Sequence, residues 1–242
     1  MIVAVHQPHF LPWLGYLDRM LQADLFIVLD HVQFERRNYQ NRTRILIDGQ
    51  PHWLTVPVIQ QSQQERVLDK KIDNPERVEL RWWGASHFQT LRYAYRKAPY
   101  FETYAPTLRK FLESRWERLV DLDQVLLEYL RDVLDIQTPL VSSSELGVDG
   151  RRSELILNLC KAVKADTFMT GMGASRSYLD RQAFADAGIE VTCQAFEHPQ
   201  YQQCGGMDFA PGLSALDLLF NHGPESREIL RGEPLPRRVA AA

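Results

Sequence analysis

The sequence predicts an α/β fold with three layers, a mostly parallel sheet, a helical insertion and a β-hairpin. Short apolar runs alternate with amphipathic helical stretches in the first and last thirds of the chain. Residues 74–136 have helical periodicity throughout. An Asp-Gly turn at 48–49 separates two strand-like runs. We therefore expect one α/β domain over residues 1–231, with the insertion at about 74–136 and a flexible tail at 232–242.

The first third predicts strand, loop, helix, strand and hairpin in that order. "MIVAV" suits a buried strand, residues 14–22 a short helix, and "DLFIVLD" at 24–30 a strand covered on both faces. "RTRILI" and "HWLTVPVI" flank the turn "DGQP". Because Pro57 lies inside the second run and cannot donate a hydrogen bond, we expect the hairpin at a sheet edge.

The middle block begins with the signature of a helix start. Asn74 suits the N-cap, Pro75 the first helical position and Glu76 the first turn. Leucines at 119, 122, 126 and 130 fall on one helical stripe, and the block is long enough for two or three helices.

The last third returns to alternation between strands and helices. It predicts strands within 139–146, 166–173 and 189–196, and helices within 151–165, 177–188 and 211–223. Gly188 and Gly223 suit the ends of the last two helices. This order of elements is typical of a Rossmann or HUP-like sheet.

Composition and charge exclude several classes of function. The net charge is -3 with 45% hydrophobic residues, which does not suggest nucleic-acid binding. No stretch approaches the ~20 apolar residues of a membrane helix, and no secretory signal opens the chain, so we expect no membrane insertion and a cytoplasmic location. The three cysteines lack the spacing of a zinc site or a disulfide framework, and we expect no metal site.

Polar side chains follow the first predicted strand. His6 and Gln7 stand where this strand ends, at the edge of a parallel sheet where ligands bind, and both exchange hydrogen bonds. Pro8 and Pro12 suit a stiff turn. Trp13 suits a cover for the sheet end, and Trp13 and Tyr16 are candidates for substrate contact.

A second polar segment follows the strand at 24–30. Asp30 ends that strand, and amides and a guanidinium follow at Gln33, Asn38, Asn41 and Arg42. Such groups recognise hydroxyls, carboxylates and phosphates. The alternative is that they cap the hairpin.

Two further loops complete the predicted site. Gly171 and Gly173 end a strand in a turn whose N–H groups suit an anion, with Tyr178 following; the alternative is a tight turn only. His198, Tyr201 and Gln203 follow the strand at 189–196 and repeat the composition of the opening loop, which favours one shared polar pocket.

Seven ordered segments run along the chain from about residue 2 to residue 226. They are "QPHFLPWLGYLDRM", "ADLFIVLDHVQF", "NRTRI", "WLTVPV", "TGMGASRSYLD", "FEHPQYQQ" and "LSALDLLFNHGPES". Together they resemble the successive motifs of the WbqC-like protein family. The resemblance implies a bacterial protein of surface-polysaccharide (O-antigen) assembly or specialised metabolism, which transfers an amino acid or acyl group to an amino sugar.

The opening is also similar to that of nucleotidyltransferases and pantothenate-synthetase-like ligases, which hold ATP phosphates with a histidine-rich loop. Tyr16 follows Gly15 where their HxGH motif has a histidine, and "SSS" precedes the glycine turn instead of following it. The implied cofactor of this alternative is ATP with Mg²⁺.

We therefore predict a transferase with a small polar substrate, namely an amino sugar, a nucleotide-sugar or a carrier-bound acyl group. His6 is the expected general base, Asp30 orients it or the acceptor amine, and His198 is a further catalytic candidate. Two alternatives stay open: an ATP-dependent ligase or nucleotidyltransferase, and a non-catalytic protein that binds a nucleotide-sugar or a carrier.

Overall fold

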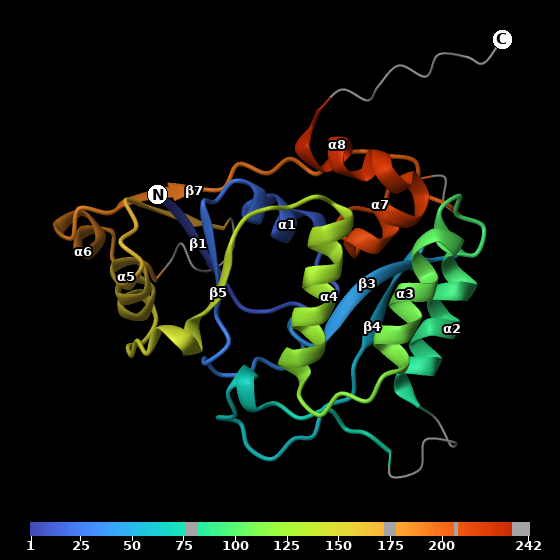
Figure 1. The fold of residues 1–242 in the computed structure, drawn as a ribbon, viewed down its shortest axis with the longest axis horizontal. Coiled ribbons are helices and arrows are strands. Elements are labelled where there is room, and N and C mark those ends of the chain that lie inside the picture. The colour runs from blue at the N-terminus through green and yellow to red at the C-terminus, as the bar shows by residue number, and fades with distance from the viewer. Residues whose placement is uncertain (76–81, 172–177, 206–207, 234–242) are drawn as a thin grey trace.

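Five parallel strands form the central sheet (Figure 1). The structure is a computed structural model that describes residues 1–75, 82–171, 178–205 and 208–233. Every neighbouring pair in the sheet is parallel, which confirms the predicted α/β class. In spatial order the strands are β5 (Leu140–Ser142), β2 (Leu25–Val28), β1 (Ile2–His6), β6 (Thr167–Thr170) and β7 (Glu190–Cys193).

The strand order reverses direction at β1, the central strand. β2 and β5 extend the sheet on one side of β1, and β6 and β7 extend it on the other. His6 pairs with Val28 of β2, and Ala4 pairs with Met169 of β6. In open α/β sheets the ligand crevice lies beyond the carboxyl ends of the strands at such a reversal. Gln7 and Gly171 are the residues that follow β1 and β6 at this reversal.

Helices cover both faces of the sheet and form two hydrophobic cores (Figure 1). Alternate residues of β1 point to opposite faces, so Ala4 belongs to the larger core and Val5 to the smaller one. The larger core contains α1 (Leu14–Leu21), α4 (Leu119–Val133) and α7 (Ala215–His222), and the smaller core contains α5 (Ser153–Ala162) and α6 (Arg181–Asp186).

The middle block contains three helices, as the periodicity predicts. They are α2 (Trp83–Tyr95), α3 (Phe101–Glu113) and α4. Asn74 lies outside these helices, where its amide donates to the Trp116 carbonyl and accepts from the Trp83 indole. Residues 76–81, which include Glu76 of the predicted helix start, lie outside the described residues.

The predicted hairpin is confirmed, and both of its strands are edge strands because they form a sheet separate from the main one. β3 (Arg42–Ile47) and β4 (Gln50–Thr55) form a separate two-stranded antiparallel sheet. Asp48 and Gly49 both have positive φ, as a tight turn between such strands requires. Pro57 lies beyond β4, so it removes no hydrogen bond from the ladder.

Shorter elements complete the fold. Gly188 and Gly223 have positive φ where α6 and α7 end, as predicted. Of the predicted tail, residues 234–242 lie outside the described residues. The remaining elements are α8 (Ser226–Arg231) and the 3₁₀ helices η1 (Val67–Asp69), η3 (Ser143–Leu146) and η5 (Gly223–Glu225).

Candidate functional site

A cluster of rings lies at the carboxyl end of β1. The ring centroid of His6 is 4.6 Å from that of His9 and 5.0 Å from that of Tyr16. His9 also stacks on Tyr39, with 5.3 Å between the centroids. The predicted residues His6 and Tyr16 therefore come together at the reversal in strand order.

His6 offers one acceptor nitrogen that has no hydrogen bond to the described residues. Its Nδ1 lies 3.0 Å from the Gln7 carbonyl oxygen, which can only accept, so Nδ1 bears the hydrogen and Nε2 has the lone pair. Burial, followed by the nearby positive charge of Arg19, lowers the pKa of His6 to about 3. The imidazole is therefore neutral at physiological pH. The Gln7 side chain is half-buried and forms no hydrogen bond within the described part of the chain.

The sequence analysis missed Arg19, whose guanidinium lies against Gly171. Arg19 is 8% exposed, and its Nε donates to Oε1 of Gln194 at 2.9 Å. A Cβ on Gly171 would lie 1.9 Å from Nη2 of Arg19, so this approach requires glycine. Gly173 lies outside the described residues. The feature that could have indicated Arg19 is its position beside Met20, in a short helix that is almost wholly buried.

Arg19 is a buried cation that could bind an anion. Among the described residues no carboxylate forms an ion pair with it. Burial lowers the pKa of Arg19, but an arginine in a protein stays charged. A buried guanidinium without a counter-ion can bind a carboxylate or phosphate through two parallel hydrogen bonds.

Three buried polar groups without partners lie next to this cluster. Within the described ranges, the Tyr16 hydroxyl, Nδ1 of His9 and both carboxyl oxygens of Asp123 have no hydrogen bond. Burial raises the pKa of Asp123 well above its usual range, which favours the protonated acid. Burial, followed by the negative charge of Asp123, also raises the pKa of Tyr16, so these two side chains are close.

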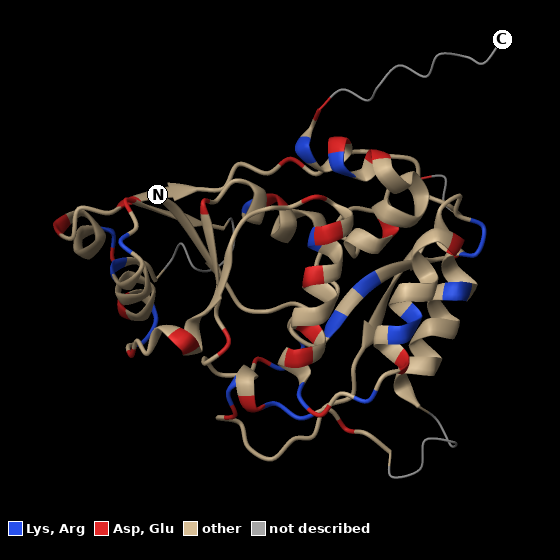
Figure 2. Ribbon diagram, in the orientation of Figure 1, with Lys and Arg blue, Asp and Glu red and all other residues tan. Residues whose placement is uncertain are grey.

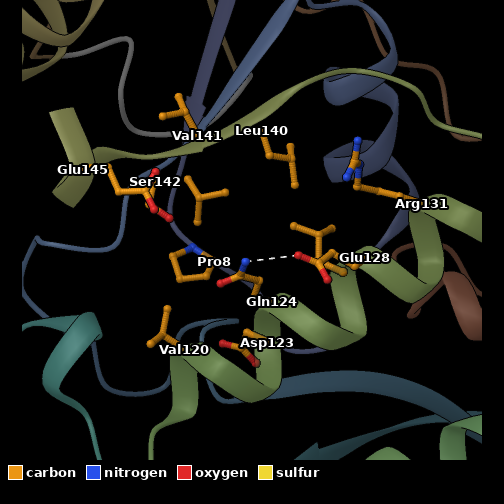
Figure 3. Close-up of a pocket in the computed structure, with 12 residues that line it drawn as sticks. Pro8, Val120, Asp123, Gln124, Glu128, Arg131, Leu140, Val141, Ser142 and Glu145 are labelled. Atoms are coloured by element: carbon orange, nitrogen blue, oxygen red, sulfur yellow. Dashed lines mark hydrogen bonds between the residues drawn. The ribbon is translucent and has the colours of Figure 1, made fainter.

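A cavity of about 290 Å³ opens at the carboxyl ends of the strands, between the sheet and α4 (Figure 3). The loop after β1, the ends of β2 and β5, and α4 all contribute to its lining. No residue of the predicted site lines it. The feature of the sequence that could have indicated this cavity is Asp123, because a carboxylate is unusual within the leucine stripe of α4. The lining includes Pro8, Val28, Asp123, Leu140, Ser142 and Glu145.

Asp30 does not meet the His6 side chain; no described hydrogen bond joins the two. Its Oδ1 accepts from the Ser143 hydroxyl and from the Ser144 N–H, each at 2.9 Å, and its Oδ2 accepts from the Ser144 hydroxyl at 2.6 Å. Asp30 is 2% exposed. It therefore joins the end of β2 to the start of η3.

His198 belongs to a different cluster from His6. Its Nδ1–H donates to the Pro199 carbonyl at 2.9 Å, and its Nε2 accepts from the Gly212 N–H at 3.1 Å, so both ring nitrogens are occupied. Burial lowers the pKa of His198. Its ring contacts Phe196, whose ring lies edge-on to Trp13 with 5.5 Å between centroids. The two loops therefore meet through Trp13, but the described contacts do not bring the two histidines into one pocket.

Tyr201 and Gln203 lie in the same region as His198. Gln203 donates to Oδ2 of Asp217 at 2.8 Å and to the Ala210 carbonyl at 3.0 Å. Burial and the charge of Asp217 raise the pKa of Tyr201. Tyr201 and Gln203 link the loop after β7 to α7 through Asp217.

The amides after β2 mostly bind their own loop and the hairpin. Gln33 donates to the Gln63 carbonyl, and Asn41 donates to the Val56 carbonyl at 2.8 Å. Arg42 donates to the Arg37 carbonyl and stacks 3.9 Å above the Trp53 ring. These contacts match the capping alternative.

Asn38 and Tyr178 approach each other through Glu35. Asn38 donates to Oε2 of Glu35 at 2.7 Å. Burial and the charge of Glu35 raise the pKa of Tyr178. The loop after β2 therefore lies beside the start of the segment that leads into α6.

Two searches returned nothing within the described ranges. No group of three or more His, Cys, Asp or Glu side chains there has the arrangement of a metal site. No helix there combines the length and the apolar composition needed to cross a membrane.

Comparisons with known proteins agree with the resemblance noted in the sequence. The model of the WbqC-like protein family matches residues 7–229. The chain is 32% identical over 232 residues to "Uncharacterized protein Rv1507c" of Mycobacterium tuberculosis (strain ATCC 25618 / H37Rv), covering 95% of this chain and 97% of that protein. No solved structure matches significantly. The chain therefore belongs to the WbqC-like protein family.

Proposed function

We propose that this protein is an enzyme that transfers a small acyl or aminoacyl group to the amine of a polar acceptor, such as an amino sugar. The neutral His6 imidazole, with its Nε2 lone pair at the carboxyl end of β1, is the observation that supports this most directly. Membership of the WbqC-like family supports a role in bacterial surface-polysaccharide (O-antigen) or specialised-metabolite biosynthesis.

The proposed step forms an amide at the acceptor nitrogen. This nitrogen bonds to the carbonyl carbon of the donor, and the bond between that carbon and the donor's leaving group breaks. His6 Nε2 accepts the proton from the acceptor nitrogen and returns it to the leaving group, as a general base and then a general acid.

Arg19 couples donor binding to the strength of this base. The positive charge of Arg19 contributes to the low pKa of His6 in the empty site. A donor carboxylate or phosphate bound to Arg19 offsets that charge, so the pKa of His6 rises toward the range in which a general base is effective.

Replacing His6 tests the proposal. We expect His6→Ala to lower turnover by about 10²–10⁴-fold, the usual contribution of general acid–base catalysis. The assay incubates the protein with acyl thioester or aminoacyl-adenylate donors and amino-sugar acceptors, and detects the amide product by mass spectrometry. His52→Ala on the exposed face of β4 is the matched control and keeps wild-type turnover. Unchanged turnover in His6→Ala would remove His6 from the mechanism.

A second candidate is an ATP-dependent ligase or nucleotidyltransferase. The reversal of strand order beside the buried Arg19 favours it, because nucleotide phosphates bind in such crevices. A non-catalytic binding protein would show saturable ligand binding without turnover in the assay above.

A further inference from the structure

We propose that the cavity between the sheet and α4 binds a primary ammonium group, with Asp123 as its counter-ion. The binding itself does not depend on the proposed reaction. Only the identification of this ammonium group with the amine of the transferase acceptor rests on the proposed function.

The charges that line the cavity favour a cation. Asp123, Glu128 and Glu145 contribute carboxyl groups, and Arg131 is the basic residue in the lining. Nη2 of Arg131 donates to the Thr138 carbonyl at 2.6 Å, so this guanidinium is engaged with backbone. Figure 2 shows the same bias along α4, where acidic positions predominate.

Asp123 lacks the partner that a buried carboxyl group needs. It is 1% exposed, and neither of its oxygens has a hydrogen bond within the described residues. Burying a polar group without a partner costs about 1–3 kcal/mol, so the native fold retains an unfavourable group at this position. In Figure 3 Asp123 extends from α4 on the side of the cavity where Val120 and Pro8 lie. A ligand ammonium group would supply the missing partner.

The size and the remaining lining suit a small polar molecule with one apolar face. About 290 Å³ is near the lower end of the volumes of small-molecule sites. Pro8, Val28 and Leu140 give one side an apolar surface, and Ser142 and Gln124 supply hydrogen-bonding groups. An amino sugar combines an ammonium group, hydroxyls and an apolar ring face.

Binding of the ammonium group must change the protonation of Asp123. In the empty cavity burial raises the pKa of Asp123 and so favours the protonated acid. An adjacent ammonium favours the carboxylate, so the acid gives up its proton as the cation enters. Proton release therefore distinguishes this site from a polar pocket that binds sugar hydroxyls alone.

Titration calorimetry on the full chain tests the proposal with two probes, glucosamine and N-acetylglucosamine, which differ in the charged amine. We expect wild-type protein to bind glucosamine at least about tenfold more tightly, since a charge-assisted hydrogen bond has at least that effect. Repeating the titration in buffers with different heats of ionisation should reveal proton release with glucosamine only.

Variants on one helix show which carboxylate is responsible. Asp123→Asn should lose the preference for glucosamine, whereas Asp132→Asn, at an exposed position of α4, should keep it. If Asp123→Asn does not fold, Glu128→Gln is the variant that tests the proposal. Glu128 is exposed, so its replacement should not disturb folding, and the loss of its charge should weaken glucosamine binding several-fold. Equal binding of the two sugars, no binding of glucosamine, or an unchanged preference in the deciding variant would overturn the proposal.

The outcome is separable from that of the proposed function. If turnover does not depend on His6, the preference for glucosamine is still expected, because it rests on Asp123 alone. Conversely, a turnover that depends on His6 but is accompanied by equal binding of both sugars would retain the transferase and reject the ammonium site.

Discussion

At the scale of single residues, burial determines the charge states at this site. Desolvation is the largest cause of the lowered pKa of His6, of the raised pKa of Asp123 and of the raised pKa of Tyr16. Each shift favours the neutral form. Arg19 is the exception, because a guanidinium cannot discharge at physiological pH. One fixed positive charge therefore lies beside these neutral groups, with the Asp18 carboxylate linked to it through Gln194.

Asp123 should make stability depend on pH. The pKa of Asp123 is higher in the folded state than its unfolded value of about 3.8, so the folded protein binds more protons. Stability consequently falls as the pH rises above about 4, until the folded-state pKa is reached. Asp123→Asn cannot ionise, and at pH 7 it should exceed the wild type in free energy of unfolding by at least about 1 kcal/mol.

Urea unfolding of both proteins from pH 4 to pH 8 measures this difference. The gap between variant and wild type should close as the pH approaches about 4. A gap that stays constant with pH would show that the Asp123 carboxyl group has the same protonation in both states.

At the scale of elements, side chains at strand ends fasten neighbouring elements together. Asp30 binds the start of η3 through Ser143 and Ser144, and Asn41 binds the segment after β4 through the Val56 carbonyl. Polar residues in such loops were predicted to contact a ligand. The structure shows that several of them satisfy backbone and side-chain groups that the fold would otherwise bury without partners.

Asp30→Asn should destabilise the protein, because the amide NH2 that replaces Oδ2 cannot accept from the Ser144 hydroxyl and the charge that strengthens the other two hydrogen bonds is lost. We expect a loss of about 2–3 kcal/mol in the free energy of unfolding, measured with urea. Ser144→Ala, which removes the 2.6 Å hydrogen bond alone, should cost about 1 kcal/mol. Wild-type stability together with lost turnover in Asp30→Asn would instead indicate the catalytic role first predicted for this residue.

At the scale of the whole molecule, the strand order brings segments that are distant in the chain to one end of the sheet. The carboxyl ends of β1 and β6 lie side by side although their sequences are more than 150 residues apart. Arg19 of α1 reaches Gly171 at the end of β6 and Gln194 just after β7. The surroundings of Arg19 are therefore built from three segments that are distant in the chain.

The ATP-dependent alternative predicts that this crevice binds a nucleotide. ATP with Mg²⁺ would then raise the melting temperature, because a ligand at 100 times its Kd stabilises the folded state by about 2.7 kcal/mol. Arg19→Lys keeps the charge but loses the paired donors and should reduce the shift, whereas Arg36→Lys at an exposed position should not. No shift at millimolar ATP in wild-type protein would count strongly against this alternative.

Local sequence signals predicted the elements and placed a candidate site at the carboxyl ends of the strands. Apolar runs and helical periodicity predicted the strands, the three helices of the middle block and the hairpin, because these signals are local. The rule that ligands bind at the carboxyl ends of parallel strands led directly to His6 and Gly171. Local signals predicted Asn74 as the N-cap of a helix, but its side chain instead forms hydrogen bonds with the Trp83 indole and the Trp116 carbonyl.

Only the tertiary structure decided which polar residues meet. The Asp30 carboxylate accepts hydrogen bonds from the serines after β5. Both ring nitrogens of His198 have hydrogen bonds to backbone groups. The hairpin forms a sheet of its own. Arg19 and Asp123 belong to α1 and α4, and the hydrophobic patterns of these helices predicted only that they pack against the core. The physical reason is that burial, hydrogen-bond partners and pKa depend on neighbours that the chain supplies from distant segments, and the order of strands in a sheet is not encoded in any one of them.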